Sequence, residues 1–180
     1  TSVLETDVDY HKAAEKAMEY CNQYGITAWL DPSAGSTGNT QQDYLDAYNY
    51  LVVTGKLTAH IAATIVADAD GDPQKQIDKV KAMQKKYNSE NLSVLGFKIF
   101  ADGVIEHPTH TAALSLPYTG TLSKGVLMFE PKKFARFATM ADQQHLLVHV
   151  HAIGDRAVTE TLNGFETVRK TNGNTNLPHT

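Results

Sequence analysis

The feature that most constrains the fold is a regular alternation of amphipathic segments with short, almost continuously apolar runs. The apolar runs cover residues 26–30, 57–67, 94–101, 146–151 and, in part, 176–179. Runs without a polar face are typical of strands in a parallel sheet that helices cover. The alternation therefore predicts an α/β fold, either a barrel or a doubly wound sheet.

The segments between the strands carry helix signals. Asp7 or Asp9 can cap a helix that ends near residue 23, and a second helix is expected over residues 41–54. Proline occupies the first helical position after Asp72 and again at Pro131. A last helix begins near Asp155, and its expected buried residues are Val158, Leu162, Phe165 and Val168.

Composition excludes several classes of protein. The 180 residues suit a single domain over 1–180, and 42% apolar residues suffice for a core. A net charge of −4 gives no general attraction to nucleic acid, and no apolar run is long enough to span a membrane. A single cysteine, Cys21, excludes an internal disulfide. We expect a cytoplasmic location, and because the chain opens with Thr1 we expect an internal piece of a longer protein.

Lys98 is the first candidate for chemistry because it interrupts an apolar strand. Alternation places Gly96 and Lys98 on one face with Asp102 just beyond, and Leu95, Phe97 and Ile99 on the other. A lysine paired with a buried carboxylate, or one that snorkels at an edge, is the simpler explanation. A neutral buried lysine can instead react with carbon dioxide, and the carbamate is an anionic ligand for metal ions.

His149 and His151 form the second candidate. Both point to one face of the strand over residues 146–151, and His151 lies at its carboxyl end, where barrel active sites are built. A hydrogen-bonded core histidine is the alternative, since two ligands do not define a metal site. Asp155 is best explained as a helix cap and could otherwise support a metal-bound histidine. His60 is expected to be packed within its strand.

A long irregular stretch follows Asp102 and runs to residue 129. Loops of this length are usually functional when they are ordered. We therefore consider Asp102, Glu106, His107 and His110 as substrate contacts, although nothing in their spacing requires that role. No phosphate loop, dinucleotide fingerprint, nucleophile elbow or cysteine pair occurs in the sequence.

Four segments resemble the amidohydrolase superfamily, in particular the branch that contains N-substituted formamide deformylase (amidohydrolase family 3). They are GFKIFADG, HVHAIGDRAV, GITAWLDPSA and TAALSLPY, and the resemblance covers nearly the whole chain. It implies a partial (β/α)8 TIM-type barrel, roughly strands two to six with their helices. It also implies a hydrolase of amide or other C–N bonds of small molecules that uses water activated by a divalent metal, with zinc expected.

The same resemblance assigns the site residues. Lys98 matches the strand-four lysine, often carbamylated, and His151 matches the strand-five histidine. Asp102, His149 and Asp155 remain candidates for supporting or substrate contacts. His179 matches a histidine that precedes the strand-six ligand in some members. The residues 106–110 differ from the usual loop, which weakens any inference about the substrate.

Some of the machinery that the family uses is absent from the sequence. There is no HxH before the first helix and no strand-eight aspartate. We therefore expect an internal fragment that is inactive alone and binds no metal, or binds it poorly. Its open sheet edges favour a homodimer or local disorder. The alternatives are a binding or regulatory protein on the same fold, and an independent open α/β domain without metal.

Overall fold

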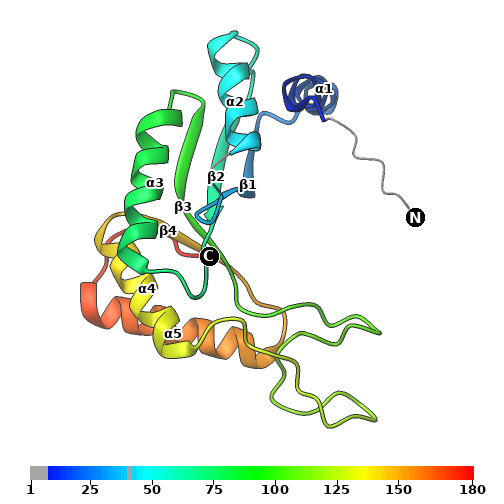
Figure 1. Cartoon of the computed structure of the whole chain (residues 1–180), viewed down its shortest axis with the longest axis vertical. Coiled ribbons are helices and arrows are strands. Elements are labelled where there is room, and N and C mark those ends of the chain that lie inside the picture. Colours follow the sequence, from blue (N-terminus) through cyan, green and yellow to red (C-terminus); the bar gives the residue numbers. More distant parts are fainter. Residues whose placement is uncertain (1–7, 40–41) are drawn as a thin grey trace.

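A computed structural model describes residues 8–39 and 42–180. The elements alternate along the chain, and Figure 1 shows them grouped around one sheet. The helices are α1 (Tyr10–Gln23), α2 (Asp43–Val53), α3 (Pro73–Tyr87), α4 (Pro131–Gln143) and α5 (Asp155–Asn172). The strands are β1 (Ala28–Ser36), β2 (His60–Val66), β3 (Leu92–Phe100) and β4 (Leu147–His151). Within this part of the chain no helix is long and apolar enough to cross a membrane.

The sheet is parallel with the order β1-β2-β3-β4, so each strand pairs with its neighbour in sequence. This order confirms the predicted α/β fold and favours the partial barrel over the doubly wound sheet, whose strand order would reverse. The end of the chain extends the sheet beyond β4. Thr180 donates its N–H to the Val148 carbonyl at 3.1 Å, and its carbonyl accepts from Val150 N–H at 2.7 Å. The fifth strand that the sequence predicts thus begins to pair with β4.

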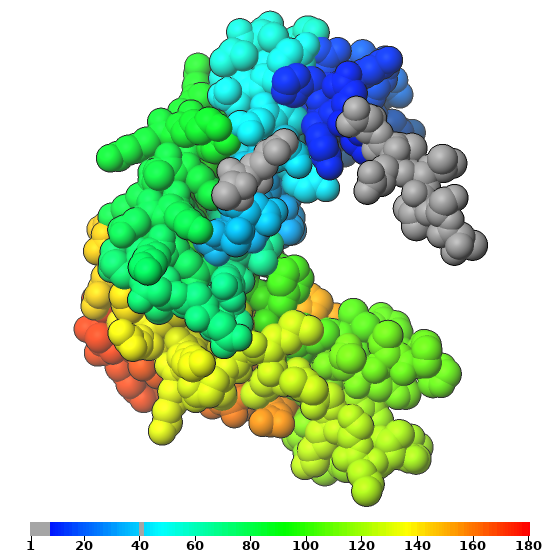
Figure 2. Space-filling view, in the orientation of Figure 1, coloured from blue at the N-terminus to red at the C-terminus, as the bar shows by residue number. Residues whose placement is uncertain are grey.

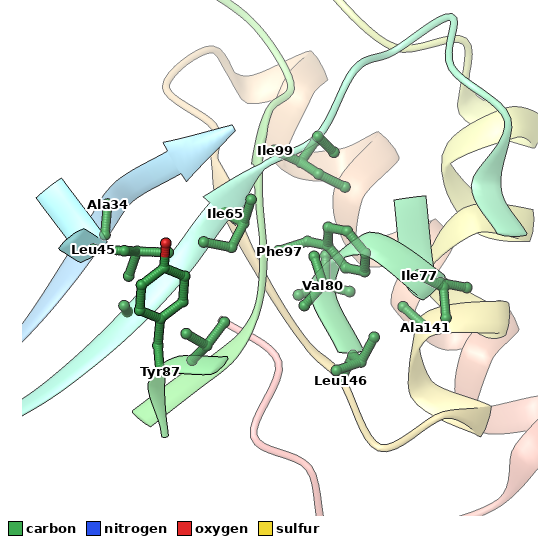
Figure 3. Close-up of a cluster of buried hydrophobic side chains, with 14 of the residues drawn as sticks. Ala34, Leu45, Ile65, Ile77, Val80, Tyr87, Phe97, Ile99, Ala141 and Leu146 are labelled. Carbon is green, nitrogen blue, oxygen red and sulfur yellow. The ribbon is translucent and has the colours of Figure 1, made fainter. Parts of the chain in front are cut away.

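Helices α2, α3 and α4 pack on one face of the sheet, while α1 packs against α2 and α5 against α4. The core between them contains Ile65 and Phe97 from the strands with Leu45, Val80 and Ala141 from the helices (Figure 3). The opposite face carries no helix, and Leu30 on β1 and Phe100 on β3 are 40% and 38% exposed. The space-filling view shows an open C, hollowed between the first two helices and the loop 101–130 (Figure 2).

Several local predictions are confirmed at the helix ends. The carboxylates of Asp9 and Asp72 accept the N–H groups of Lys12 and Lys75, and so cap α1 and α3. Proline occupies the first turn of α3 and α4, as predicted. Each of these signals is local and needs no tertiary contact.

The strand assignments need corrections. β1 begins two residues later than predicted and runs six residues further, through Pro32, which an edge strand tolerates. His60 is exposed at the first position of β2 rather than packed within a strand. The pairing of β2 with β3 skips Leu95, because Ala63 pairs with Val94 and Thr64 with Gly96. This bulge moves Leu95 to the uncovered face, whereas simple alternation had placed it with Phe97.

The buried stripe of α5 also differs from the prediction. Val158 and Leu162 are 40% and 61% exposed. The stripe consists instead of the small residues Ala157, Thr161 and Gly164, followed by Val168. A Cβ at Gly164 would lie 2.3 Å from the Phe134 ring of α4, so the glycine permits the close packing of these two helices.

Candidate functional site

The candidate residues meet at the carboxyl end of the sheet, on its uncovered face. In the parallel register Lys98 pairs with Val66 on one side and with His149 on the other. His151 pairs with Phe100, two residues further along the two strands. The register thus brings Lys98, His149 and His151, which alternation had assigned to faces only within their own strands, to the same face of the sheet. In barrel proteins this end of the strands carries the chemistry.

Lys98 is buried without a carboxylate partner. It is 6% exposed, and its Nζ atom lies 4.9 Å from the centre of the Phe100 ring. Across residues 8–39 and 42–180 the ion pairs do not involve Lys98. Burial lowers the pKa of its amine below the ordinary value. The simpler explanation of a buried ion pair is therefore not realised.

His149 lies beside Lys98 and is half-buried. Its Nδ1 atom is 2.7 Å from the hydroxyl of Thr180. Burial and the nearby charge of Lys98 both lower the pKa of His149. The ring is thus biased toward its neutral form, the form that can bind a metal ion. Thr180 was not singled out from the sequence, because its contact depends on the pairing of the chain end with β4.

His151 is fixed by the loop that follows β3. Its Nε2 atom lies 2.9 Å from the carbonyl oxygen of Gly103 and 3.8 Å from a carboxylate oxygen of Asp102. Both neighbours are acceptors, so the geometry favours a proton on Nε2, and in the neutral ring Nδ1 would then have a free lone pair. Histidines that bind metals commonly donate their other ring N–H to a carbonyl in this way.

Asp102 supports the loop rather than facing the solvent. Its carboxylate accepts N–H groups from Ala113 at 2.8 Å, Ile153 at 3.0 Å and Gly154 at 2.8 Å. The side chain is fully buried. These donors occupy both oxygens, so the geometry favours a supporting role for Asp102 over direct contact with a substrate.

Asp155 does not cap α5 as predicted; Gly154 occupies the cap position. The carboxylate of Asp155 instead accepts the N–H of Ser115 at 2.9 Å and also its hydroxyl. These hydrogen bonds from Ser115 lower the pKa of Asp155. Asp155 therefore attaches the long loop to the first turn of α5.

His179 does not contact Lys98 and belongs to a buried polar cluster between β4 and the end of α4. Its Nδ1 atom accepts the N–H of Val148 at 3.1 Å, and its Nε2 atom contacts Asp142 at 2.9 Å. Asp142 also accepts hydrogen bonds from Asn172 and Thr175. Both ring nitrogens of His179 are engaged, so the geometry gives it a structural role. Asp142 gave no sequence signal, because its partners lie 30 to 37 residues further along the chain.

The candidate residues could supply at most part of a metal site. No group of three or more His, Cys, Asp or Glu residues within the described ranges could hold a metal ion. Nδ1 of His151 and the neutral or carbamylated amine of Lys98 suit a divalent ion such as zinc, which binds nitrogen and oxygen ligands. A tetrahedral site needs more ligands than these two.

The model of the amidohydrolase family matches residues 2–180. The chain belongs to this family. Its relatives include the exoenzymes regulatory protein AepA of Pectobacterium carotovorum subsp. carotovorum, 31% identical over 88% of this chain and 33% of that protein. Protein LONG AFTER FAR-RED 3 of Arabidopsis thaliana is 27% identical over 95% of this chain and 29% of its own length.

Solved structures give the same picture. An uncharacterized metal-dependent hydrolase from Pyrococcus horikoshii OT3 superposes with TM-score 0.72 and is 27% identical in sequence. The match covers 95% of the present chain and 31% of the Pyrococcus chain. One from Pyrococcus furiosus matches with TM-score 0.71 and 27% identity. A triazine hydrolase variant, 13% identical with TM-score 0.50, shares the fold alone. The chain spans about a third of the length of these relatives.

Proposed function

We propose that this chain forms strands two to six of a metal-dependent hydrolase barrel that cleaves amide or other C–N bonds of small molecules. The observation that carries the proposal is the buried, carboxylate-free Lys98 beside His149 and near His151 at the carboxyl end of a parallel sheet. The family match and the metal-dependent hydrolases among its structural relatives support it. The formamide deformylase branch is our proposal for the closest activity.

The residues divide into binding and supporting roles. Lys98, as its carbamate, and Nδ1 of His151 would hold a divalent metal, for which we propose zinc. The bound ion would acidify a water molecule and so supply the nucleophile. Gly103 and Asp102 fix the ring of His151, and Thr180 fixes that of His149. The remaining ligands and the general base would come from a longer polypeptide, so we expect the 180-residue chain alone to be inactive.

A test uses the longer polypeptide with the substitutions Lys98→Met and His151→Asn. Both variants should lose bound metal and lose hydrolysis of a panel of N-acylated amines by more than the roughly 10–100-fold typical of outer-shell partners. His145→Asn is the control, because that exposed ring lies at the end of α4, away from the site. Retention of metal and activity in both variants would refute the proposed ligands.

A second candidate function follows from one relative. AepA bears the name of a regulatory protein. A regulatory or binding protein on this fold would bind a small molecule at the same strand ends without hydrolysing it. Metal-independent binding of panel compounds by the longer polypeptide, without turnover, would favour this alternative.

A further inference from the structure

The long loop after β3 is attached to the first turn of α5 around Ala113 and Ser115. Its residue Ala113 donates its N–H to Asp102, and its carbonyl accepts the N–H groups of Arg156 at 3.1 Å and Ala157 at 3.3 Å. These two donors lie in the first turn of α5, where N–H groups lack partners within the helix. On either side of this anchor the loop projects away from the sheet (Figure 1).

The carboxylate of Asp102 lies at the centre of this anchor. One oxygen accepts from Ala113 and Gly154 and the other from Ile153, so it joins the loop to the turn between β4 and α5. The approach is close, because a Cβ at Gly154 would lie 2.0 Å from the Ala113 carbonyl. Asp102 thus fixes both segments that leave the carboxyl ends of β3 and β4.

The same carboxylate faces the ring of His151. It lies 3.8 Å from Nε2, and the acceptor of that atom, the Gly103 carbonyl, belongs to the residue that follows Asp102. Anchoring Asp102 therefore also fixes the position of the Gly103 carbonyl. The negative charge and the carbonyl together favour the tautomer with the proton on Nε2.

We propose that Asp102 is a positioning residue, which holds the His151 ring with Nδ1 free for a metal ion and locks the long loop to α5. This inference rests on the proposed function only in naming the metal ion as the partner of Nδ1. The ring orientation and the loop anchor are properties of this chain by itself.

The substitution Asp102→Asn tests this positioning role. The amide has the shape of the carboxylate but places an NH2 group where one of the two oxygens accepts main-chain N–H groups. At least one buried donor then faces another donor. The amide also removes the negative charge next to His151. Asp72→Asn is the matched control, because asparagine caps a helix as well as aspartate does.

The experiment measures two signals in the 180-residue chain by NMR. Two-bond nitrogen–proton spectra of histidine give the tautomer of His151, assigned through the loss of its signal in His151→Gln. Hydrogen exchange gives the protection of the Ala113, Ile153 and Gly154 amides. We expect the Nε2–H form in the native chain. In Asp102→Asn we expect a mixture of tautomers and amide exchange faster by about tenfold or more, with neither change in Asp72→Asn.

The tautomer of His151 and the amide exchange rates test the two parts of this proposal separately. Faster exchange with an unchanged tautomer would overturn the positioning role and leave Asp102 as a loop anchor only. No change in either signal would overturn the whole inference. If Asp102→Asn does not fold, the native chain still tests the idea, because an Nδ1–H tautomer for His151 would contradict it. None of these results depends on metal or activity, so they stay separate from a failure of the proposed function.

Discussion

A buried cation without a counter-charge lowers the stability of the folded protein. It is retained only where it brings another advantage. Lys98 has no acidic partner among the ion pairs of residues 8–39 and 42–180, and its neighbours are Val66, His149 and the ring of Phe100. Proteins keep a residue of this kind mainly where function demands it. This loss of stability supports the proposal that Lys98 is a metal ligand, because we expect a lysine with a purely structural role to have an acidic partner.

Replacing Lys98 with methionine should therefore stabilise the isolated chain. Methionine has a similar length, fills the same space and needs no hydration, so the free energy of unfolding should rise by about 1 kcal/mol at neutral pH. Urea unfolding measures the change. Lys75→Met, at a surface position on α3, is the control and should change little. A clear loss of stability in Lys98→Met would mean that the ammonium group has a stabilising partner.

Asp142 is the opposite case, a buried charge with full hydrogen bonding. Burial alone would raise its pKa, but hydrogen bonds from Thr175, Asn172 and His179 outweigh burial and leave the pKa below its ordinary value. A carboxyl whose pKa is lowered in the folded state stabilises the fold above the unfolded pKa. That contribution is lost as the pH falls through the folded pKa.

Asp142→Asn should destabilise the chain by about 1–3 kcal/mol at pH 7, because an amide leaves at least one buried donor unsatisfied. The difference from the native chain should shrink as the pH falls below about 4, because the carboxyl takes up a proton in the unfolded chain there before it does so in the folded chain. Urea unfolding at a series of pH values measures both effects. A difference that stays constant down to pH 2 would show that the charge of Asp142 contributes nothing.

At this scale the sequence predicted which side chains share a face but not what they contact. Strand periodicity sufficed to place His149 and His151 on one face of their strand, because the alternation of side chains is a local property, whereas the family resemblance joined Lys98 to His151. The partners of Asp102 and Asp142 come from residues 11 to 52 positions away, and no local pattern encodes such contacts.

The loop 101–130 and α5 approach each other closely at Ala113 and Gly154. Gly154 allows the loop to approach the helix, and a methyl group there would collide with the Ala113 carbonyl. Gly154→Ala should therefore destabilise the chain by about 1–3 kcal/mol, the usual cost of overpacking. Gly38→Ala is the control, because the nearest atom to its added Cβ, the Ser36 hydroxyl, lies at 3.5 Å. Equal effects of the two substitutions in urea unfolding would contradict the close approach.

Element types were predictable wherever local chemistry decides them. Asp9, Asp72 and Pro131 mark helix starts that the structure confirms. The bulge at Leu95 and the small-residue stripe of α5 were not predictable. Both arise from the way neighbouring elements fit together, and a bulge reverses every facing assignment on one side of it.

The whole molecule is an open sheet with two edges, since the described strands do not close into a barrel. β1 lies at one edge and β4, with the paired residue Thr180, at the other. Open edges present unpaired main-chain groups that favour association. We propose that the isolated chain forms homodimers through them.

Sedimentation velocity over a range of concentrations tests this association. We expect a dimer fraction that grows with concentration, and a smaller fraction in Leu30→Lys, which places a charge on the edge strand. Leu122→Lys is the control, because that side chain is 96% exposed and lies in the long loop, outside the sheet edges. A monomer at all concentrations would contradict the association.

The central claim is that Lys98 and His151 belong to a metal site that this amidohydrolase chain cannot complete alone. The most direct measurement is metal content by mass spectrometry, on the 180-residue chain and on the longer polypeptide side by side. We predict stoichiometric divalent metal in the longer polypeptide and little or none in the chain. Absence of metal from both would contradict the hydrolase assignment and favour the binding or regulatory protein.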